Sequence, residues 1–480
     1  MPASRALARI GLTLTLTLIT AAGACSGKKS STGSPLQVSG DPHLVELAVE
    51  PTADRVLAEQ VGELAVRIRV SAAKLPPGER PPLDLALVLD TSGSMEGEAI
   101  EAEKQAARDL VARLTPRDRV SLVIFHSTAE VLVPATPVTD AARQQLAKAI
   151  DGITARGTTD LASGLALGIQ QAQAGRVQGS IDRIVLLGDG VPNDPAPIPG
   201  LVAQAVSLHL SITTLGLGVE FDPELLGKIA TDTGGRYHYL DEPAQVAGVF
   251  EDELLKMRQV IGKNLALNLV AGPGVILEPM GGFQPMGNGL YAVLGDLTAG
   301  EIVDVVVPLR VAGRRDGATV ELLDATLTFE DATMGAGALR RNGFAKVKSD
   351  ADPAAVAASV KTAIAIARDR ARANSAILDA IAHARAGDLA GAKAIVETAI
   401  AATRAALNEH QDPDLQRDLE KLELLRTDLP ELAAAAMRAL EVQKAYATGA
   451  GGAAPAPAAA PADVERRTRA MHDEALDTVR

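Results

Sequence analysis

The sequence predicts a multidomain α/β protein with a doubly wound, mostly parallel sheet, a flanking β-sandwich module and a C-terminal helical bundle. The chain has 480 residues, which is too long for one compact core. In its middle part, short apolar runs alternate with helical patterns, as in βαβ units. On both sides of this part, apolar and polar residues alternate with a period of two, which indicates half-buried antiparallel strands.

The composition restricts the kinds of core and partner. Apolar residues make up 47% of the chain and aromatic residues only 2%, so the cores are expected to be aliphatic. The formal net charge of −13 argues against electrostatic attraction to nucleic acid or to anionic lipid headgroups. After the N-terminal segment we find no apolar run of about 20 residues, so we expect no membrane span in the mature chain.

The first 24 residues have the pattern of a secretory signal peptide. Arg5 and Arg9 supply a positive start, the apolar stretch 10–19 follows, and small residues occupy positions 21–24. We therefore expect residues 1–24 to be removed on export.

The chain has a single cysteine, Cys25, which cannot form an intramolecular disulfide. The sequence Ala-Gly-Ala-Cys at 22–25 resembles the lipobox of bacterial lipoproteins, which implies that Cys25 is lipidated and that 25–42 form a lipidated tether. An ordinary signal peptide followed by a chance cysteine is the alternative. Ser26 stands where inner-membrane lipoproteins carry Asp, so we expect anchoring in the cell envelope at the outer membrane rather than the inner membrane.

Two segments with a period of two are expected to form the β-sandwich. Residues 43–82 contain two alternating runs and end in a proline-rich stretch, and the alternation returns over 259–349. We expect the strands of these two segments to pair, which would make the α/β domain an insertion in a β-sandwich. Separate sheets are the alternative.

The α/β domain is predicted over 83–258. Its buried strands are expected from apolar runs, and helices lie between them at i, i+3, i+4, i+7 spacing. A short, proline-bearing strand over 130–138 is expected at the edge of the sheet, antiparallel to its neighbour. The four apolar runs lie at 85–89, 120–125, 184–187 and 212–217.

The alanine-rich segment 352–447 is predicted to be helical. Asp352-Pro353 is typical of a helix start, and breaks are expected at 386–388, 412–413 and 428–430. We find no second copy at the spacing of about 34 residues that a tetratricopeptide repeat requires, so a plain helical bundle is the prediction. Residues 448–480 are expected to be a disordered linker and tail.

The candidate functional residues follow the first buried strand. Asp90, Ser92 and Ser94 stand at every second position of a loop, where Gly93 permits a tight turn. In an open parallel sheet, ligands bind beyond the carboxyl ends of the strands. A carboxylate and two hydroxyls are hard ligands that suit Mg²⁺ or Mn²⁺.

Two later loops offer further oxygen ligands. Thr158 and Thr159 precede a helix, and Asp189 ends another buried strand. Asp90 and Asp189 together would balance the charge of one divalent cation. The two acids could instead form a general acid/base pair, but no nucleophile with an activating base accompanies them, so we expect no enzymatic activity.

The three motifs together resemble the metal-ion-dependent adhesion site of von Willebrand factor A domains, a Rossmann-like fold found in integrins and bacterial surface proteins. The resemblance implies that Ser92 and Ser94 bind the metal directly and that Asp90 and Asp189 act through water. It implies that Thr159 joins in the ligand-ready state, with Thr158 as the alternative. Gly188 departs from the family, which usually has Thr there.

We therefore expect an extracytoplasmic, lipid-anchored binding protein that holds a divalent metal ion. Mg²⁺ is the expected ion, with Mn²⁺ or Ca²⁺ as alternatives, and the expected partner is a protein presenting a carboxylate. Contact with the membrane is expected through the lipid anchor only, and no nucleic acid is expected. One alternative is a structural envelope protein in which the metal only stabilises the fold. The other is a chelatase-like accessory to an enzyme.

Overall fold

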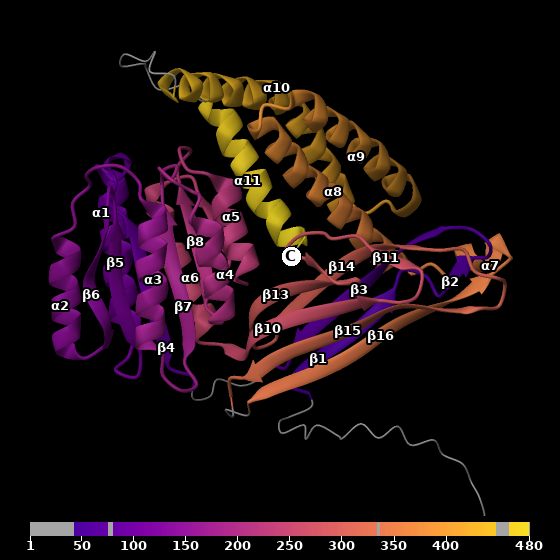
Figure 1. Ribbon diagram of the computed structural model, residues 1–480, viewed down its shortest axis with the longest axis horizontal. Coiled ribbons are helices and arrows are strands. Elements are labelled where there is room, and N and C mark those ends of the chain that lie inside the picture. The colour runs from indigo at the N-terminus through magenta and orange to yellow at the C-terminus, as the bar shows by residue number, and fades with distance from the viewer. Residues whose placement is uncertain (1–42, 75–79, 334–336, 448–459, 480) are drawn as a thin grey trace, which may run out of the picture. The chain divides into compact units, whose positions relative to one another are not determined.

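The computed structural model describes residues 43–74, 80–333, 337–447 and 460–479. The predicted signal peptide 1–24 and the whole predicted tether 25–42, with the predicted lipidation site Cys25, lie outside these residues. Figure 1 shows an α/β domain, a module of two antiparallel sheets and a helical region. Within the described ranges, none of the helices is both long and apolar enough to cross a membrane.

The α/β domain is built on a six-stranded sheet of order β6-β5-β4-β7-β8-β9. All neighbouring strands are parallel except β6, which pairs antiparallel with β5 at the edge. This confirms the predicted edge strand. The strands are β4 (Leu83–Asp90), β5 (Arg119–Phe125), β6 (Ala129–Pro137), β7 (Ile181–Gly188), β8 (Ser211–Leu217) and β9 (Tyr237–Leu240).

The central strand β4 is buried on both faces because helices cover both sides of the sheet. Leu85, Leu87 and Leu89 pack in one core with α1 (Glu98–Arg113), α2 (Asp140–Asp151) and α6 (Val246–Met257). The alternate residues Ala86 and Val88 pack with α3 (Leu161–Gly175), α4 (Ile198–Ser207) and α5 (Pro223–Asp232). The strand order reverses beside β4, so a ligand site is expected at its carboxyl end.

The β module is made of two segments that are far apart in the sequence. Ile302 to Val311 of β14 pair antiparallel with Ser71 to Gly62 of β3. The α/β domain is therefore inserted between the two halves of the β module, as predicted. One sheet has the order β1-β3-β14-β11 and contains β1 (Val45–Pro51), β3 (Gly62–Ala72), β14 (Ile302–Val311) and β11 (Val275–Leu277).

The second sheet has the order β12-β13-β10-β15-β16-β2 and shares one hydrophobic core with the first. Val66 and Ile68 of β3 lie in this core with Leu267 of β10 and Leu327 of β15, all of them fully buried. The alternation predicted from the sequence therefore places one face of each sheet inside. The strands are β12 (Gln284–Met286), β13 (Gly289–Thr298), β10 (Val260–Ala271), β15 (Thr319–Asp331), β16 (Ala338–Asp350) and β2 (Arg55–Leu57).

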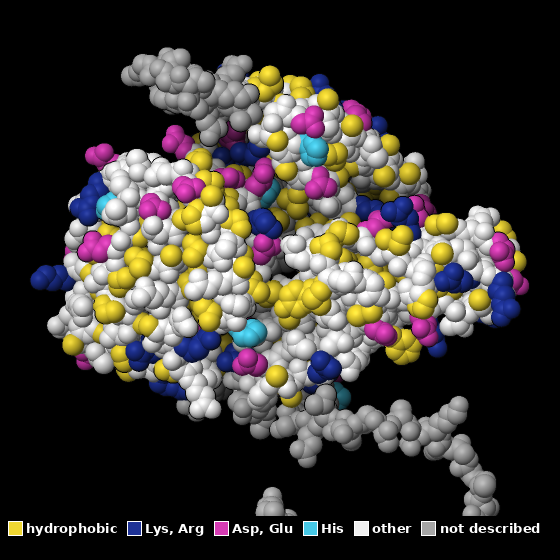
Figure 2. All heavy atoms as spheres, viewed as in Figure 1, with side chains coloured by type: hydrophobic (Ala, Val, Ile, Leu, Met, Phe, Trp, Pro, Cys, Tyr) yellow, Lys and Arg dark blue, Asp and Glu magenta, His cyan; other side chains and the backbone are white. Residues whose placement is uncertain are grey.

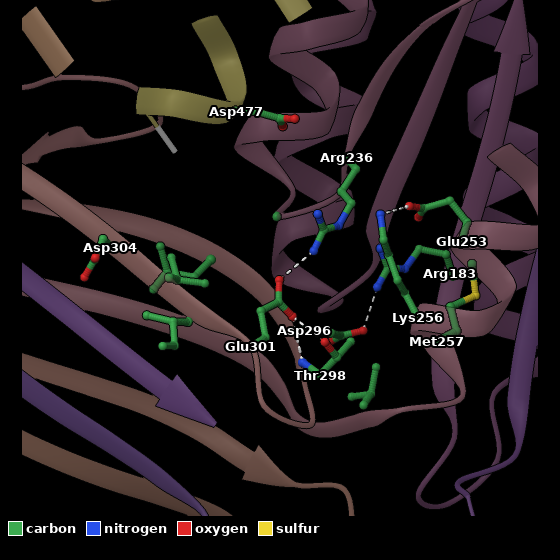
Figure 3. A pocket seen from close by; sticks show the side chains of 15 residues that line it. Arg183, Arg236, Glu253, Lys256, Met257, Asp296, Thr298, Glu301, Asp304 and Asp477 are labelled. Atoms are coloured by element: carbon green, nitrogen blue, oxygen red, sulfur yellow. Dashed lines mark hydrogen bonds and ion pairs between the residues drawn. The ribbon is translucent and has the colours of Figure 1, made fainter. Parts of the chain in front are cut away.

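A charged joint connects the α/β domain to the β module (Figure 3). Arg183 of β7 donates to Asp296 of β13 at 2.8 Å, and both side chains are almost completely buried. Arg236, before β9, pairs with Glu301 at 2.6 Å. These residues line a cavity of about 310 Å³. Because buried charges need partners, the two pairs constrain how the domains meet.

Figure 2 shows acidic and basic side chains interspersed over the face that it draws. Many are paired within the described residues, as Arg108 is with Asp151 at 2.5 Å. Exposed pairs of this kind contribute little to stability.

The helical region contains α7 (Pro353–Ala358), α8 (Thr362–Arg385), α9 (Leu389–His410), α10 (Pro413–Ala447) and α11 (Ala462–Val479). Asp352 caps α7 as its sequence suggested, by accepting from the Ala354 N–H. The predicted break at 428–430 is wrong, because α10 continues through Pro430. Buried Leu429 and Leu432 on either side of the proline anchor the helix in its core.

The prediction of a disordered tail is also wrong for 462–479, which form α11. Val464, Met471 and Ala475 recur at helical spacing on one face of α11 and pack in the core with α8, α9 and α10. Many of the other positions are charged, so from its composition alone the segment resembles a solvated tail.

Candidate metal centre

The carboxyl end of β4 leads directly into the predicted metal-binding loop. The Ser92 and Ser94 Oγ atoms lie 3.1 Å apart. Ser94 Oγ donates to Asp189 Oδ1 at 2.7 Å, and Ser92 Oγ lies 3.5 Å from the same oxygen. The loops after β4 and β7 therefore bring two hydroxyls and one carboxylate together although they are almost a hundred residues apart in sequence.

Asp90 lies beneath this cluster and is completely buried. Its Oδ1 atom accepts the Ser92 N–H at 2.8 Å, while Oδ2 has no hydrogen-bond partner among the described residues. Burial raises the pKa of Asp90 to about 7 and also raises the pKa of Asp189. A buried carboxylate oxygen without a donor is costly. A cation bound beside it would offset that cost, so the donor set fits a hard divalent ion.

Thr159 reaches the same cluster from the loop before α3. A Cβ atom on Gly190 would lie 2.8 Å from Thr159 Oγ1 and 3.7 Å from Ser94 Oγ. Thr159 Oγ1 therefore lies where a side chain at position 190 would interfere, and Ser94 Oγ lies at ordinary contact distance from the same point. The Asn193 N–H donates to the Thr159 carbonyl at 2.9 Å and links the loops after β7 and before α3.

Thr158 faces another group of residues. Its Oγ1 accepts from Asn193 Nδ2 at 2.8 Å and lies 3.3 Å from Ser127 Oγ. Thr158 is exposed, whereas Thr159 is buried. Of the two threonines that the sequence left open, Thr159 is the one placed beside Ser94.

Backbone hydrogen bonds hold the loops of the cluster against each other. The Thr91 N–H donates to Phe125 O, the Gly93 N–H to Gly157 O and the Arg156 N–H to Thr91 O. Gly157 has φ of 76°, a left-handed conformation that favours glycine. Met95, fully buried in the core, fixes the end of the loop.

A third buried acid near the site, Glu103, was not predicted from the sequence. Glu103 lies on α1, is fully buried, and neither carboxylate oxygen has a hydrogen-bond partner within the described part of the chain. Burial raises its pKa well above the usual range, and the charges of Asp90 and Asp189 raise it further. Its position could have been found, because Glu103 falls on the helical stripe of Ile100 and Ala107.

A small cavity lies beside Asp90, where the sequence departs from the family. Its volume is about 10 Å³, close to the space of one water molecule. A Cβ atom at Gly188 would lie 3.6 Å from Asp90 Oδ2, so a side chain there would face the unpartnered oxygen. Thr159, Gly190 and Asp222 also line this cavity.

His126 and Arg156, on neighbouring exposed loops, are paired with each other. Arg156 Nε donates to His126 Nε2 at 3.1 Å. No group of three or more His, Cys, Asp or Glu side chains is placed to hold a metal ion in the ranges that the structure describes. The cluster described above has two carboxylates and takes its other oxygens from Ser92, Ser94 and Thr159, so it is not a group of that kind.

The doubly wound sheet with this loop cluster defines a von Willebrand factor type A domain. Residues 84–252 match the family model of that name, so the chain contains such a domain. It is related to the uncharacterized protein sll0103 of Synechocystis, with 34% identity over 227 residues, 46% of this chain and 53% of the relative. YfbK of Escherichia coli is 25% identical over 254 residues, 49% of this chain and 43% of YfbK.

A human protein, inter-alpha-trypsin inhibitor heavy chain H4, is 29% identical over 181 residues, which cover 36% of this chain and 20% of that protein. The chain thus spans about half, or less, of the length of these curated relatives. 

Two solved structures share the wider fold. A von Willebrand factor type A protein from Catenulispora acidiphila has a TM-score of 0.62 at 19% identity, covering 79% of this chain and 89% of that one. The ArnB paralog VWA2 from Sulfolobus acidocaldarius has a TM-score of 0.53 at 17% identity, covering 81% and 97%. At such identities the likeness concerns the fold alone.

Proposed function

We propose that this chain is a protein-binding component of the cell envelope that uses one divalent metal ion to engage an acidic side chain of its partner. The observation that carries the proposal is the cluster of Ser92, Ser94 and Asp189 oxygens near Asp90 Oδ2, which has no hydrogen-bond partner in the described part of the chain. Such oxygens suit Mg²⁺, with Mn²⁺ or Ca²⁺ as alternatives.

Each residue of the cluster has a distinct part in this proposal. Ser92 and Ser94 would hold the ion directly, and Asp90 and Asp189 would hold it through water and balance its charge. Hydroxyl ligands donate little charge, so the bound ion would supply an electrophilic position for an incoming carboxylate. Thr159 would join when the partner is bound.

Metal binding is tested by calorimetric titration of the mature chain with Mg²⁺ and with Mn²⁺. Ser92→Ala and Asp189→Ala are each expected to weaken binding at least tenfold, because each removes an oxygen from the cluster. Ser207→Ala, an exposed serine on α4, is the control and should bind like the unmodified chain. Equal affinities for all four proteins would contradict the proposal.

Partner binding is tested with envelope extract applied to the immobilised chain with Mg²⁺ or with chelator. We expect one or more proteins to be retained in Mg²⁺ and lost with chelator or with Ser92→Ala. Retention that survives both changes would exclude an adhesive role of the metal.

The buried acids favour a second candidate role, in which the metal only stabilises the fold. Burial raises the pKa of both Asp90 and Asp189, so a bound cation would stabilise the domain whether or not a partner is present. In that case chelator would lower the melting temperature without changing partner binding.

We also propose that the chain acts by binding rather than by catalysis.

The envelope location rests on Cys25, for which we propose lipidation and anchoring at the outer membrane. The support is the lipobox-like sequence that precedes it. Mass spectrometry of the purified chain should show an acylated N-terminal cysteine, and Cys25→Ala should release the chain from the membrane fraction. A Cys25→Ala chain that still sediments with membranes would contradict the anchor.

A further inference from the structure

The C-terminal helix α11 contacts the loop that follows β8 through one buried arginine. Arg469 Nη1 donates to the Phe221 carbonyl at 2.9 Å, and Nη2 donates to the Val219 carbonyl at 2.8 Å. The Arg469 side chain is almost completely buried. Figure 1 shows α11 running beside α5, the helix that this loop enters. One side chain therefore fixes two carbonyl groups of the 219–222 segment.

The same guanidinium also packs on the aromatic ring of that segment. It lies 4.4 Å from the centroid of the Phe221 ring, a cation–π contact. The Phe221 ring fills the space over Gly216, where a Cβ atom would lie 2.2 Å from it. Burial lowers the pKa of Arg469 only to about 10, so it stays a cation at neutral pH, and Glu465 lies 3.4 Å away. The contact combines charge, hydrogen bonds and packing.

The 219–222 segment in turn forms part of the surroundings of the metal centre. Gly216 of β8 pairs with Gly188 of β7, so both strands end at the same edge of the sheet. Asp222 lines the small cavity beside Asp90 together with Thr159. The Glu220 charge contributes to the raised pKa of Asp189. A displacement of this segment would change both the wall of the cavity and the field at Asp189.

We propose that Arg469 is a positioning residue of the metal centre. It holds the 219–222 segment in place, and this segment in turn keeps the candidate oxygen ligands in position before the ion binds. The inference rests on the proposed function, since it concerns the affinity of that same centre. Ligands held in place before binding lose less conformational freedom when the ion arrives. Loss of the Arg469 contacts therefore weakens metal binding.

The helix that carries Arg469 is also joined to the other helices. Arg385 of α8 pairs with Glu465 of α11 at 3.0 Å, and Arg467 of α11 pairs with Asp428 of α10 at 2.9 Å. The helical region is thus connected to the metal centre by a continuous set of contacts through α11. A partner that displaced α11 would lower the affinity of the centre for its ion.

The test compares Arg469→Met with Arg466→Met in the mature chain. Met keeps the apolar stem and removes the charge and the two hydrogen bonds. Arg466 is the matched control, because it lies on the same helix and is exposed, with an ion pair to Asp241 at 3.0 Å. We measure the Mg²⁺ dissociation constant by calorimetry and the stability of each chain by urea unfolding in chelator.

Arg469→Met is expected to weaken Mg²⁺ binding about tenfold, whereas Arg466→Met should stay within twofold of the unmodified chain. Arg469→Lys keeps the charge but cannot reach both carbonyls, so an intermediate affinity is expected. Amide hydrogen exchange should be faster at 219–222 in Arg469→Met than in the unmodified chain. If Arg469→Met does not fold, the affinity of Arg469→Lys decides the question.

Two results would overturn the inference. In the first, Arg469→Met loses stability but binds Mg²⁺ as tightly as the unmodified chain, which would make Arg469 a structural residue and leave the proposed function intact. In the second, the unmodified chain binds no Mg²⁺ that depends on Ser92 and Asp189, and the proposed function fails together with the inference.

Discussion

At Asp90, a feature that suits metal binding lowers the stability of the fold without the metal. The Asp90 Oδ2 atom is buried without a donor among the residues that the structure describes, and Gly188 leaves space beside it. A hydroxyl at position 188 could donate to this oxygen. We expect Gly188→Ser to raise the free energy of unfolding in chelator by about 1 kcal/mol, the usual net value of a hydrogen bond. Urea unfolding measures this difference.

Gly188→Ala is the matched control, because it adds the Cβ atom without the hydroxyl. Phe125 also lies 4.0 Å from a Cβ atom at this position, so both variants would share any steric effect. Equal stabilities of the serine and alanine variants would show that Asp90 Oδ2 gains nothing from the new donor.

Asp84 gives a pH-dependent prediction at the opposite end of β4. Its side chain is buried, and burial followed by the charge of Asp182 raises its pKa to about 7. The folded pKa thus exceeds the unfolded value of 3.8, so folding binds a proton, and stability falls as the pH rises from about 4 to 7. Asp84→Asn removes this loss. Its stability advantage over the unmodified chain should grow across this range and reach about 2–4 kcal/mol above pH 7.

The measurement is urea unfolding at several pH values between 4 and 8. Asp109→Asn, an exposed site on α1, is the control and should show no such trend. An advantage of Asp84→Asn that does not change with pH would show that Asp84 does not titrate in the folded chain within this range.

The sequence predicted which candidate oxygens lie together better than it predicted their surroundings. Asp90, Ser92 and Ser94 stand in one short motif, and Asp189 follows a buried strand, so pattern and spacing were sufficient. Glu103 was not predicted as buried, since a glutamate is normally expected at the surface even where it has the helical spacing of buried apolar residues. The choice between Thr158 and Thr159 needed the side-chain directions, which the motif does not contain.

At the scale of elements, strands buried on both faces were the easiest to predict and the C-terminal helices the hardest. The apolar runs of β4, β5, β7 and β8 are continuous because helices cover both faces of their sheet. In α11 the buried face includes Glu465, Arg469 and His472. Glu465 pairs with Arg385 and lies 3.4 Å from Arg469, and burial lowers the pKa of His472 to about 3, which keeps it neutral. A pattern of apolar residues alone cannot show such a face.

Pro430 gives a prediction for α10, where the sequence indicated a break. The proline is exposed and lies inside the helix, where its ring conflicts with the carbonyl one turn earlier and no N–H is present. We expect Pro430→Ala to raise the free energy of unfolding by about 1–3 kcal/mol, because it restores the hydrogen bond without losing buried surface. Thermal unfolding followed by circular dichroism measures this effect. A lower stability would mean that the packing of Leu429 and Leu432 requires the bend that proline causes.

At the scale of the whole molecule, the shared two-residue period of both halves of the β module indicated that one domain is inserted into another but left separate sheets open. The pairing of β3 with β14 decides between these two topologies. The charged residues that join the domains were not predictable. Nothing in the sequence pattern of the two strands indicates that Arg183 of one pairs with Asp296 of the other. Such pairs depend on the placement of whole sheets, which local sequence does not determine.

The buried pair of Arg183 and Asp296 contributes to the stability of the chain. Asp296 accepts from Arg183 at 2.8 Å and from the Asn264 N–H at 3.1 Å, and it is almost fully buried. Asp296→Asn leaves the Arg183 charge buried without its counter-ion, so we expect a loss of about 3 kcal/mol in the free energy of unfolding. Asp304→Asn is the matched control, because Asp304 lines the same cavity but pairs with Arg69 in a partly exposed position.

Breaking that exposed pair should cost less than about 1 kcal/mol, since solvent screens both charges. Calorimetric unfolding of the two variants measures the difference and also shows whether the α/β domain and the β module still unfold in one transition. With Asp296→Asn we expect the single transition to broaden or divide, because the buried pair links the two cores. If both variants lose the same small amount, the joint is as well solvated as the surface, and the pair of Arg183 and Asp296 does not hold the two domains together.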